Sequence, residues 1–290
     1  MTVQAIGTAQ PSERRIILHT RGQVIEAHRQ YGVHKRAAGV LSIAVEPIAE
    51  EVPIALAYNG ISHAVMLATP QELEDFAVGF SLSECIVERA GEIYDINLVE
   101  HPNGMEVQVE IASVRALSLK ERRRALAGRT GCGLCGAESL DQLHSHARIV
   151  ESSAALSYAA LARAQSQLLD MQPLYRLTGA VHAAAWCGLD GSVAIMREDV
   201  GRHNALDKLA GHLARARIDA ATGLLLLTSR VSVEMVQKAA FMAAPVMVAI
   251  SAPTALALRE ADAAGITIVA VARDDGFEVF THPARIETGR

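Results

Sequence analysis

The sequence predicts an α/β protein in which a small α+β domain precedes a three-layer α/β/α domain with a mostly parallel sheet. The chain has 290 residues, of which 50% are hydrophobic, so it can bury two cores. Short paired strands with two helices fill its first part, and apolar strands alternate with helices in its second part. The expected divisions are a flexible N-terminus over 1–25, the α+β domain over 26–128, a connecting loop and helix over 129–150, and the α/β/α domain over 151–290.

The first domain is predicted from two hairpins and two helices. In "EVPIALAYNGISHAVMLAT", two apolar runs flank Asn59-Gly60, a dipeptide typical of tight hairpin turns. The next stretch, "TPQELEDFAVGFSLSECI", predicts a helix with Thr69 as N-cap and Pro70 at the first position. A second hairpin is expected where "EIYDINLVE" and "MEVQVEIAS" flank residues 101–104, and "LSLKERRRALA" predicts another helix.

The second domain is predicted from continuously apolar strands. The stretch "SYAALARAQSQLLDM" indicates a helix, and "GAVHAAAWC" and "GSVAIMRE" indicate paired strands before the helix "GRHNALDKLAGHLARAR". Strands then follow at "GLLLLTS", "PVMVAIS", "ITIVAVAR" and "FEVFTH", with helices at "VEMVQKAAFMA" and "PTALALREADAAG". Strands without polar alternation belong to a sheet that helices cover on both faces.

Composition excludes several classes of protein. A net charge of −5 and a pI near 6.1 provide no basic field for nucleic acid or an anionic membrane. The sequence contains no apolar run long enough to span a bilayer, and its start lacks the features of a secretion signal, so a cytoplasmic protein is expected. Four cysteines are too few for a disulfide scaffold, and Cys85 and Cys187, in apolar segments, are predicted to be small buried hydrophobes.

Polar residues collect where the predicted strands end. Because ligands of such sheets bind at the carboxyl ends of the strands, beside helix N-termini, these residues are expected to surround one crevice. Arginines, hydroxyls and open helix N-termini suit a phosphate-bearing ligand, and the alternative is that the residues cap helices and pair with each other. The set comprises Glu198, Asp199, Arg202, His203 and Asn204, then Ser229, Arg230 and Ser232, then Ser251 and Thr254, then Arg273, Asp274 and Asp275.

The stretch "RTGCGLCGAES" holds two cysteines among glycines. Its Gly-x-Gly-x-x-Gly pattern is not a dinucleotide fingerprint, because the preceding residues predict a helix rather than a strand. Zinc could be held by Cys132 and Cys135 with His144 and His146, although the spacing of the histidines is unusual. A thioredoxin-type redox pair would open a helix after a strand, which is not expected here. The remaining interpretation is an accessible thiolate that carries a chemical group. One protein would load the group onto the thiolate, and another site would remove it.

The chain resembles the FdhD family of formate dehydrogenase accessory sulfurtransferases. The resemblance runs from about Val52 to the C-terminus and rests on "TGCGLCG", "REDVGRHNALDKLAG", "TSRVSVEMVQKA", "VAISAPTALA" and "NGISHAVMLATPQELEDFAVGF". It implies a sulfurtransferase in which a cysteine desulfurase loads a persulfide onto Cys132, with help from Cys135. The sulfur would pass to the bis-molybdopterin guanine dinucleotide molybdenum cofactor, which is bound as substrate before it enters formate dehydrogenase, and no permanent metal is expected.

The resemblance also implies a cytidine deaminase-like second domain, a homodimer, and cofactor contacts from the segment "VARDDG". The helix starts of the second domain lack the cysteines that hold catalytic zinc in nucleoside deaminases, so hydrolytic deamination is not expected. The alternatives kept open are a non-enzymatic chaperone of the molybdenum cofactor and a zinc-binding module using Cys132 and Cys135. The predicted cofactor contacts are Val271, Ala272, Arg273, Asp274, Asp275 and Gly276 from the resemblance, and Arg202, His203, Asn204, Ser229, Arg230 and Ser251 from the strand ends.

Overall fold

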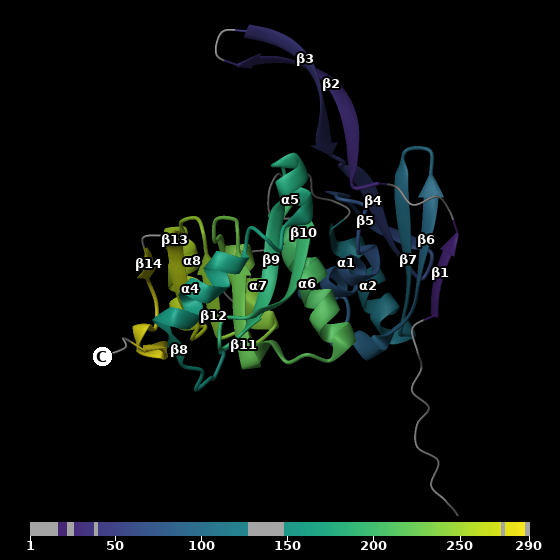
Figure 1. Cartoon of the computed structure of the whole chain (residues 1–290). Coiled ribbons are helices and arrows are strands. Elements are labelled where there is room, and N and C mark those ends of the chain that lie inside the picture. Colours follow the sequence, from purple (N-terminus) through teal and green to yellow (C-terminus); the bar gives the residue numbers. More distant parts are fainter. Residues whose placement is uncertain (1–16, 22–25, 38–39, 127–147, 274–275, 288–290) are drawn as a thin grey trace, which may run out of the picture.

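The computed structural model describes residues 17–21, 26–37, 40–126, 148–273 and 276–287, and Figure 1 shows their arrangement. The fold is mixed α/β, as the sequence predicts, with one large sheet in each half of the molecule and two further two-stranded sheets, β2-β3 and β8-β15, among the described residues. Helices in the described ranges are all too short or too polar to cross a membrane.

The N-terminal sheet has five strands in the order β1-β6-β7-β4-β5. Both predicted hairpins are confirmed, and Asn59 and Gly60 turn the first one with φ values of 47° and 78°. Such paired positive angles are the geometry for which Asn-Gly is favoured. The strands are β1 (Ile17–Arg21), β4 (Val52–Tyr58), β5 (Ile61–Ala68), β6 (Ile93–His101) and β7 (Gly104–Ile111).

Two elements near the N-terminus were not expected from the sequence. Within the range expected to be flexible, Ile17–Arg21 forms β1 and pairs in parallel with β6. Residues His28–Ala37 and Val40–Ala49 form β2 and β3, an antiparallel hairpin that projects from the body of the molecule (Figure 1). We call this hairpin the arm.

One face of the N-terminal sheet packs on helix α1 (Leu73–Ser83), and Phe76 of this helix is completely buried there. The helix begins later than predicted, with Glu72 rather than Thr69 before its first residue. The Thr69 hydroxyl instead accepts a hydrogen bond from the Val200 amide at 3.1 Å, so it connects the two halves. The second predicted helix is α2 (Ser113–Leu126), which follows β7.

The C-terminal sheet has the order β10-β9-β11-β12-β13-β14. The prediction of a mostly parallel sheet is wrong for its described part, because only β11, β12 and β13 are mutually parallel and the other neighbouring pairs are antiparallel. The two paired strands, β9 and β10, join the same sheet and place β9 beside β11. The bounds are β9 (His182–Gly188), β10 (Val193–Asp199), β11 (Gly223–Leu227), β12 (Val246–Ala249), β13 (Thr267–Arg273) and β14 (Gly276–Val279).

Helices cover both faces of this sheet. One face packs on α6 (Arg202–Ala216), α7 (Val233–Phe241) and α8 (Ala255–Ala263), and the other packs on α4 (Tyr158–Gln167). Alternate residues of each strand enter the two cores, as with Leu225 and Leu226 of β11. The remaining elements are α5 (Pro173–Thr178), β8 (Leu156–Ser157), β15 (Ile286–Glu287), and the 3₁₀ turns η1 (Ala90–Glu92), η2 (Ala220–Thr222) and η3 (Pro283–Arg285).

The two halves meet where α1 crosses α6, with a glycine from each helix at the crossing. A Cβ atom added to Gly79 would lie 1.7 Å from the Asp207 carbonyl oxygen, and one added to Gly211 would lie 1.8 Å from the Asp75 carbonyl oxygen. No side chain larger than hydrogen fits at these positions, so the backbones touch.

Candidate functional site

The strand ends of the C-terminal sheet lie along one edge. Strand β9 is antiparallel to both β10 and β11, so β10, β11, β12 and β13 all run in the same direction. Backbone hydrogen bonds join the loops that follow them: the Val231 amide donates to Ala252, and the Val271 amide donates to Ser251. The loop after β11 therefore neighbours the loop after β12, which in turn contacts the end of β13. We call this region, together with the start of α6, the strand-end site.

Two half-buried side chains at the start of α6 each have one buried nitrogen atom without a hydrogen-bond partner among the described residues. The atoms are Arg202 Nε and His203 Nε2. The N-cap of the helix is Gly201, which offers no side chain to its first amides. Most buried polar groups have partners, so two neighbouring exceptions at a helix N-terminus indicate a place that a ligand or water completes.

The charge of His203 depends on its surroundings. Burial lowers the pKa of His203, and the positive charges of Arg202 and Lys238 lower it further, so the ring is neutral near pH 7. One ring nitrogen can then donate a hydrogen bond while the other accepts one. The pKa of Glu234, in the first turn of α7, is also lowered: burial opposes ionisation, but hydrogen bonding to the carboxylate and the positive charge of Arg202 outweigh it.

The sequence analysis missed Glu234 and Lys238, which stand four residues apart on α7. Lys238 Nζ lies 2.7 Å from Asp207 Oδ1 and 2.8 Å from Ser83 Oγ, and so joins α7 to α6 and to the end of α1. Opposite charges spaced by four residues at the start of a predicted helix were the signal available in the sequence.

Asn204 occupies a different place from its neighbours in α6. It is buried, and its amide nitrogen donates to the Leu67 carbonyl at 2.8 Å and to Asp199 Oδ1 at 3.0 Å. Asp199 also accepts the Thr69 amide, and its carboxylate pairs with the buried ammonium of Lys208. These residues hold the start of α6 against the connection between β5 and α1, so the amide of Asn204 is engaged at the junction of the two halves.

The other predicted contacts differ in exposure. Arg230 is exposed on the loop after β11, Ser251 is half-buried, and the buried Ser229 hydroxyl donates to the Arg230 carbonyl. The Ala272 side chain is 1% exposed and packs in the core under α4. Val271 has a φ of 53° at an irregularity in the pairing of β13 with β14. A β-branched residue in this region is strained, and such strain concentrates at functional sites.

Several predicted residues lie outside what the structure describes. Cys132, Cys135, His144 and His146 belong to this group, as do Asp274 and Asp275, and of Arg273 only the backbone in β13 is described. Their predicted roles therefore stay predictions, and the predicted contact Gly276 is the exposed first residue of β14.

The two cysteines inside the described ranges differ from each other. Burial raises the pKa of Cys187 to about 12, helped by the nearby Asp190, which confirms a buried, unreactive thiol. The prediction that Cys85 is buried is wrong. Cys85 follows the end of α1 in a left-handed turn, with φ of 52°, and is exposed.

The profile of the FdhD/NarQ family matches residues 49–287 of this sequence. The chain belongs to the FdhD/NarQ family. Among its relatives, the sulfur carrier protein FdhD of Cupriavidus necator is 53% identical over 260 residues, which cover 90% of each chain. The sulfur carrier protein FdhD of Xanthomonas euvesicatoria is 48% identical over 257 residues, which cover 89% of this chain and 92% of the relative.

A solved structure has the same fold as this member of the FdhD/NarQ family. It is the crystal structure of a candidate formate dehydrogenase accessory protein from Desulfotalea psychrophila. It superimposes with a TM-score of 0.72 at 24% identity, covering 90% of this chain and all of the other. The strand-end site lies inside the segment that the family profile matches, whereas β2 and all but the last residue of β3 precede it.

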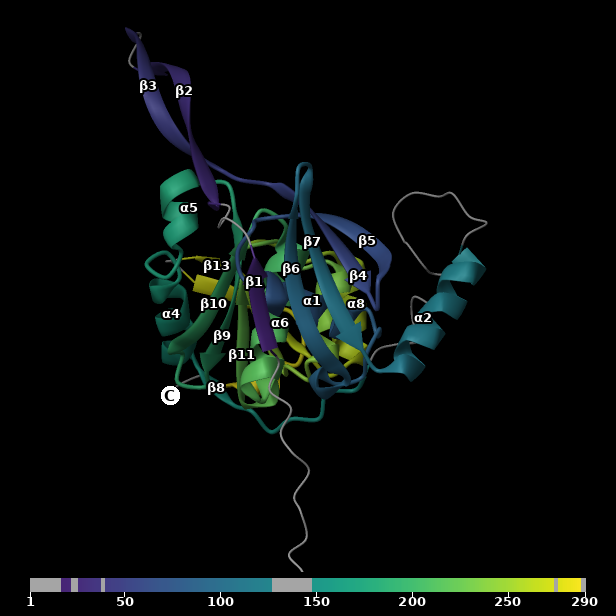
Figure 2. The same ribbon diagram turned by 90° about the vertical axis from the view of Figure 1, so that its right-hand side faces the viewer.

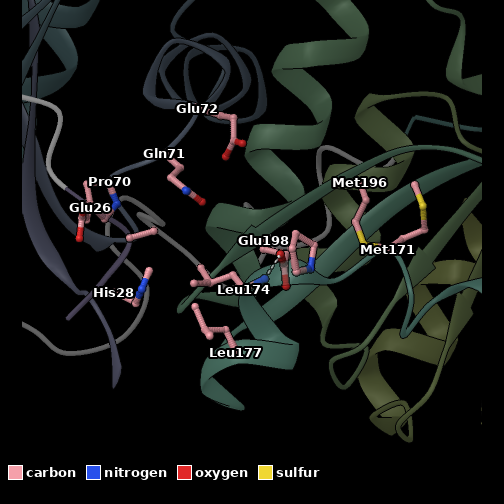
Figure 3. Close-up of a pocket in the computed structure, with 12 residues that line it drawn as sticks. Glu26, His28, Pro70, Gln71, Glu72, Met171, Leu174, Leu177, Met196 and Glu198 are labelled. Atoms are coloured by element: carbon pink, nitrogen blue, oxygen red, sulfur yellow. Dashed lines mark hydrogen bonds between the residues drawn. The ribbon is translucent and has the colours of Figure 1, made fainter. Parts of the chain in front are cut away.

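A separate cavity of about 760 Å³ lies at the base of the arm (Figure 3). Figure 3 shows Glu198, Leu174 and Leu177 on one side of it and Glu26, Gln71 and Glu72 on the other. The Glu198 carboxylate accepts the amides of Leu174 and Tyr175 at 2.9 and 2.8 Å, and burial raises its pKa. None of the predicted cofactor contacts lines this cavity among the described residues.

Proposed function

We propose that this protein is a cytoplasmic sulfur carrier that transfers persulfide sulfur to the molybdenum cofactor of formate dehydrogenase. The observation that carries the proposal is the pair of unpartnered buried atoms, Arg202 Nε and His203 Nε2, at an open helix N-terminus in a chain half identical to named sulfur carrier proteins. A bis-molybdopterin guanine dinucleotide is rich in phosphate and guanine groups. Cationic and neutral hydrogen-bond donors at a helix N-terminus suit such a ligand.

The loading step belongs to Cys132. Its thiolate attacks the terminal sulfur of a persulfide on a cysteine desulfurase, the donor's sulfur–sulfur bond breaks, and the donor cysteine leaves as a thiolate. Cys132 then carries the persulfide with no net oxidation or reduction, and Cys135 assists. The upstream residues Arg122, Arg123, Arg124 and Arg129 supply positive charge in the sequence, which favours thiolates.

The cofactor is the substrate that receives this sulfur. Arg202 and His203 would hold its phosphate or guanine groups, with Arg230 on the neighbouring loop and the Val271–Gly276 segment at the end of β13. The cytidine deaminase-like arrangement expected for the second domain supports this placement, because such folds bind ligands at the strand ends that β10, β11, β12 and β13 share. The loaded cofactor would then pass to formate dehydrogenase, and the carrier would act as a homodimer.

Intact-mass analysis after incubation with a cysteine desulfurase and cysteine tests the loading step. A gain of one sulfur atom that a reductant removes is expected for the wild type and for Cys85→Ala, and no gain is expected for Cys132→Ala. A Cys132→Ala chain that gains sulfur as the wild type does would reject Cys132 as the carrier.

The alternatives give different results in the same samples. A chaperone without sulfur chemistry would bind the cofactor but gain no mass in any variant. A zinc-binding module would contain stoichiometric zinc by metal analysis, and it would lose that zinc in both Cys132→Ala and Cys135→Ala.

A further inference from the structure

The arm carries an apolar stripe that the described part of its own chain leaves exposed. Leu41, Ile43 and Val45 alternate along β3, so their side chains share one face, and they are 68%, 78% and 66% exposed. An isolated two-stranded hairpin is only marginally stable in water, and contiguous exposed apolar side chains mark interaction sites. The arm is therefore expected to pack against a further layer.

A second exposed apolar surface lies on the outer face of the N-terminal sheet. The inner face packs on α1, whereas Val65 and Leu67 on β5 point away from that core and are 62% and 54% exposed. The register places Ala55 opposite Val65 and Pro53 opposite Leu67, which extends the apolar area onto β4. Figure 2 shows this sheet from its outer side, with β6 and β7 in front and α1 behind.

The two surfaces have complementary borders. On the arm, His34 pairs with Ile43 and Arg36 pairs with Leu41, so basic residues flank the apolar stripe. On the sheet, Glu106 of β7 pairs with Ala55 of β4, so an acidic residue flanks the apolar area. Arm-to-arm packing would instead bring basic borders together, which is unfavourable.

We propose that the apolar face of the arm of one protomer packs on the outer face of the N-terminal sheet of a second copy of this chain. In a two-fold dimer the second copy returns the same contact. The arm is about 33 Å long and about 10 Å wide, and two reciprocal sheet-on-sheet contacts of that size bury roughly 1,300 Å², within the range of stable complexes. The proposal adds a specific interface to the expected homodimer, uses a segment that mostly precedes the family-matched region, and does not depend on sulfur chemistry.

Sedimentation velocity over a dilution series tests the interface through four variants. Ile43→Asp on the arm and Val65→Lys on the sheet are each expected to raise the dimer dissociation constant at least about tenfold. The matched control is Tyr31→Asp, on the opposite face of the arm and 53% exposed, which is expected to keep the wild-type constant. Ile43→Asp combined with Val65→Lys places opposite charges across the contact and is expected to recover much of the loss.

Each other outcome overturns the proposal. A wild-type chain that remains monomeric would mean that the arm contacts a different protein. Weaker dimerisation in Ile43→Asp but not in Val65→Lys would mean that the arm packs on another arm. If the two substitutions weaken dimerisation additively when combined, the arm and the sheet do not contact each other in the dimer. Melting curves for all variants test whether unfolding causes the weaker dimerisation. Unfolding is not expected, because the substituted side chains are exposed.

Discussion

Lys208 Nζ lies 2.8 Å from Asp199 Oδ2, and both side chains are completely buried. The ammonium also donates to the Thr69 carbonyl at 2.9 Å, so α6 is tied to the segment that leads into α1. Removing one partner of a buried ion pair strands the other charge, at a cost of about 3–5 kcal/mol. Lys208→Met is therefore expected to lower the free energy of unfolding by about 3–5 kcal/mol in urea titrations.

Lys35→Met is the matched control for this prediction. Lys35 pairs with Glu46 on the arm, and both side chains face solvent, so its loss is expected to leave the free energy of unfolding unchanged. Equal effects of the two substitutions would show that the buried pair contributes no more than a surface pair.

Gly79→Ala is expected to destabilise the protein by about 3 kcal/mol, because the added methyl group forces α1 and α6 apart. Gly91→Ala meets no atom within 4 Å and is expected to be nearly neutral. Thermal and urea unfolding of both variants measure the difference. A Gly79→Ala protein as stable as the wild type would mean that the helices cross at a greater distance than the structure shows.

His203 predicts a stability loss in mild acid. Its pKa lies below the ordinary value of 6.5, so the unfolded chain takes up the proton at higher pH than the folded chain does. Its contribution to stability is present above the unfolded pKa and is lost as the pH falls through that value. Between about pH 7.5 and pH 5, the free energy of unfolding is expected to fall less in His203→Gln than in the wild type.

Urea titrations at both pH values measure this difference. Glu198, whose pKa is raised, acts in the opposite direction but is common to both proteins. His182 has a pKa lowered by burial and by Arg202, and His182→Gln provides a second comparison. Parallel pH profiles for His203→Gln and the wild type would contradict a neutral, half-buried His203.

Arg230 is expected to bind the phosphates of a guanine nucleotide at the strand-end site. Replacing it by alanine should weaken GDP binding by roughly 1.5–3 kcal/mol, or about ten- to a hundredfold, as for loss of a charge-assisted hydrogen bond. Because Arg230 is exposed, the melting temperature should not change. Calorimetric titration measures the affinity, with Arg163→Ala on α4 as the control. Unchanged affinity in Arg230→Ala would remove this residue from the site.

Cys135→Ala is expected to weaken sulfur transfer less than Cys132→Ala does. The expectation rests on the family resemblance, because the two thiols are equivalent in spacing alone. Persulfide content by intact mass and the rate of transfer to an acceptor thiol measure the two steps separately. Equal loss of persulfide in both variants would show that the two cysteines act as one unit.

The helices and strands that could be predicted are those whose sequence pattern lies within the element itself. Asn59-Gly60 specifies a turn through its own backbone preferences, and the apolar run of β11 indicates a strand buried on both faces. The arm has no such signal, because β2, "HRQYGVHKRA", contributes to no core and needs no apolar alternation. The start of α1 was also misplaced, since Thr69 bonds to Val200 rather than to its own helix.

The sequence could predict where the candidate site lies in the fold, but not which side chains face it or which contacts they make. Strand direction brings Arg202, His203, Arg230 and Ser251 to one edge, as residue type and position suggested. Asn204 satisfied the same sequence criteria, but its amide is engaged with a carbonyl 137 residues away. The positive φ of Val271 likewise depends on the pairing of β13 with β14, which no local pattern encodes.

The close crossing of α1 and α6 means that the two halves, although each has its own core, form a single folding unit. Asn204, Asp207 and Lys208 lie on a helix surface that also bonds to the N-terminal half, through Leu67, Ser83 and Thr69. A chain divided between α2 and α4 would expose buried polar groups on both fragments, so neither fragment should reach a native state alone. Expressed together, the fragments should assemble by fitting one glycine backbone against the other.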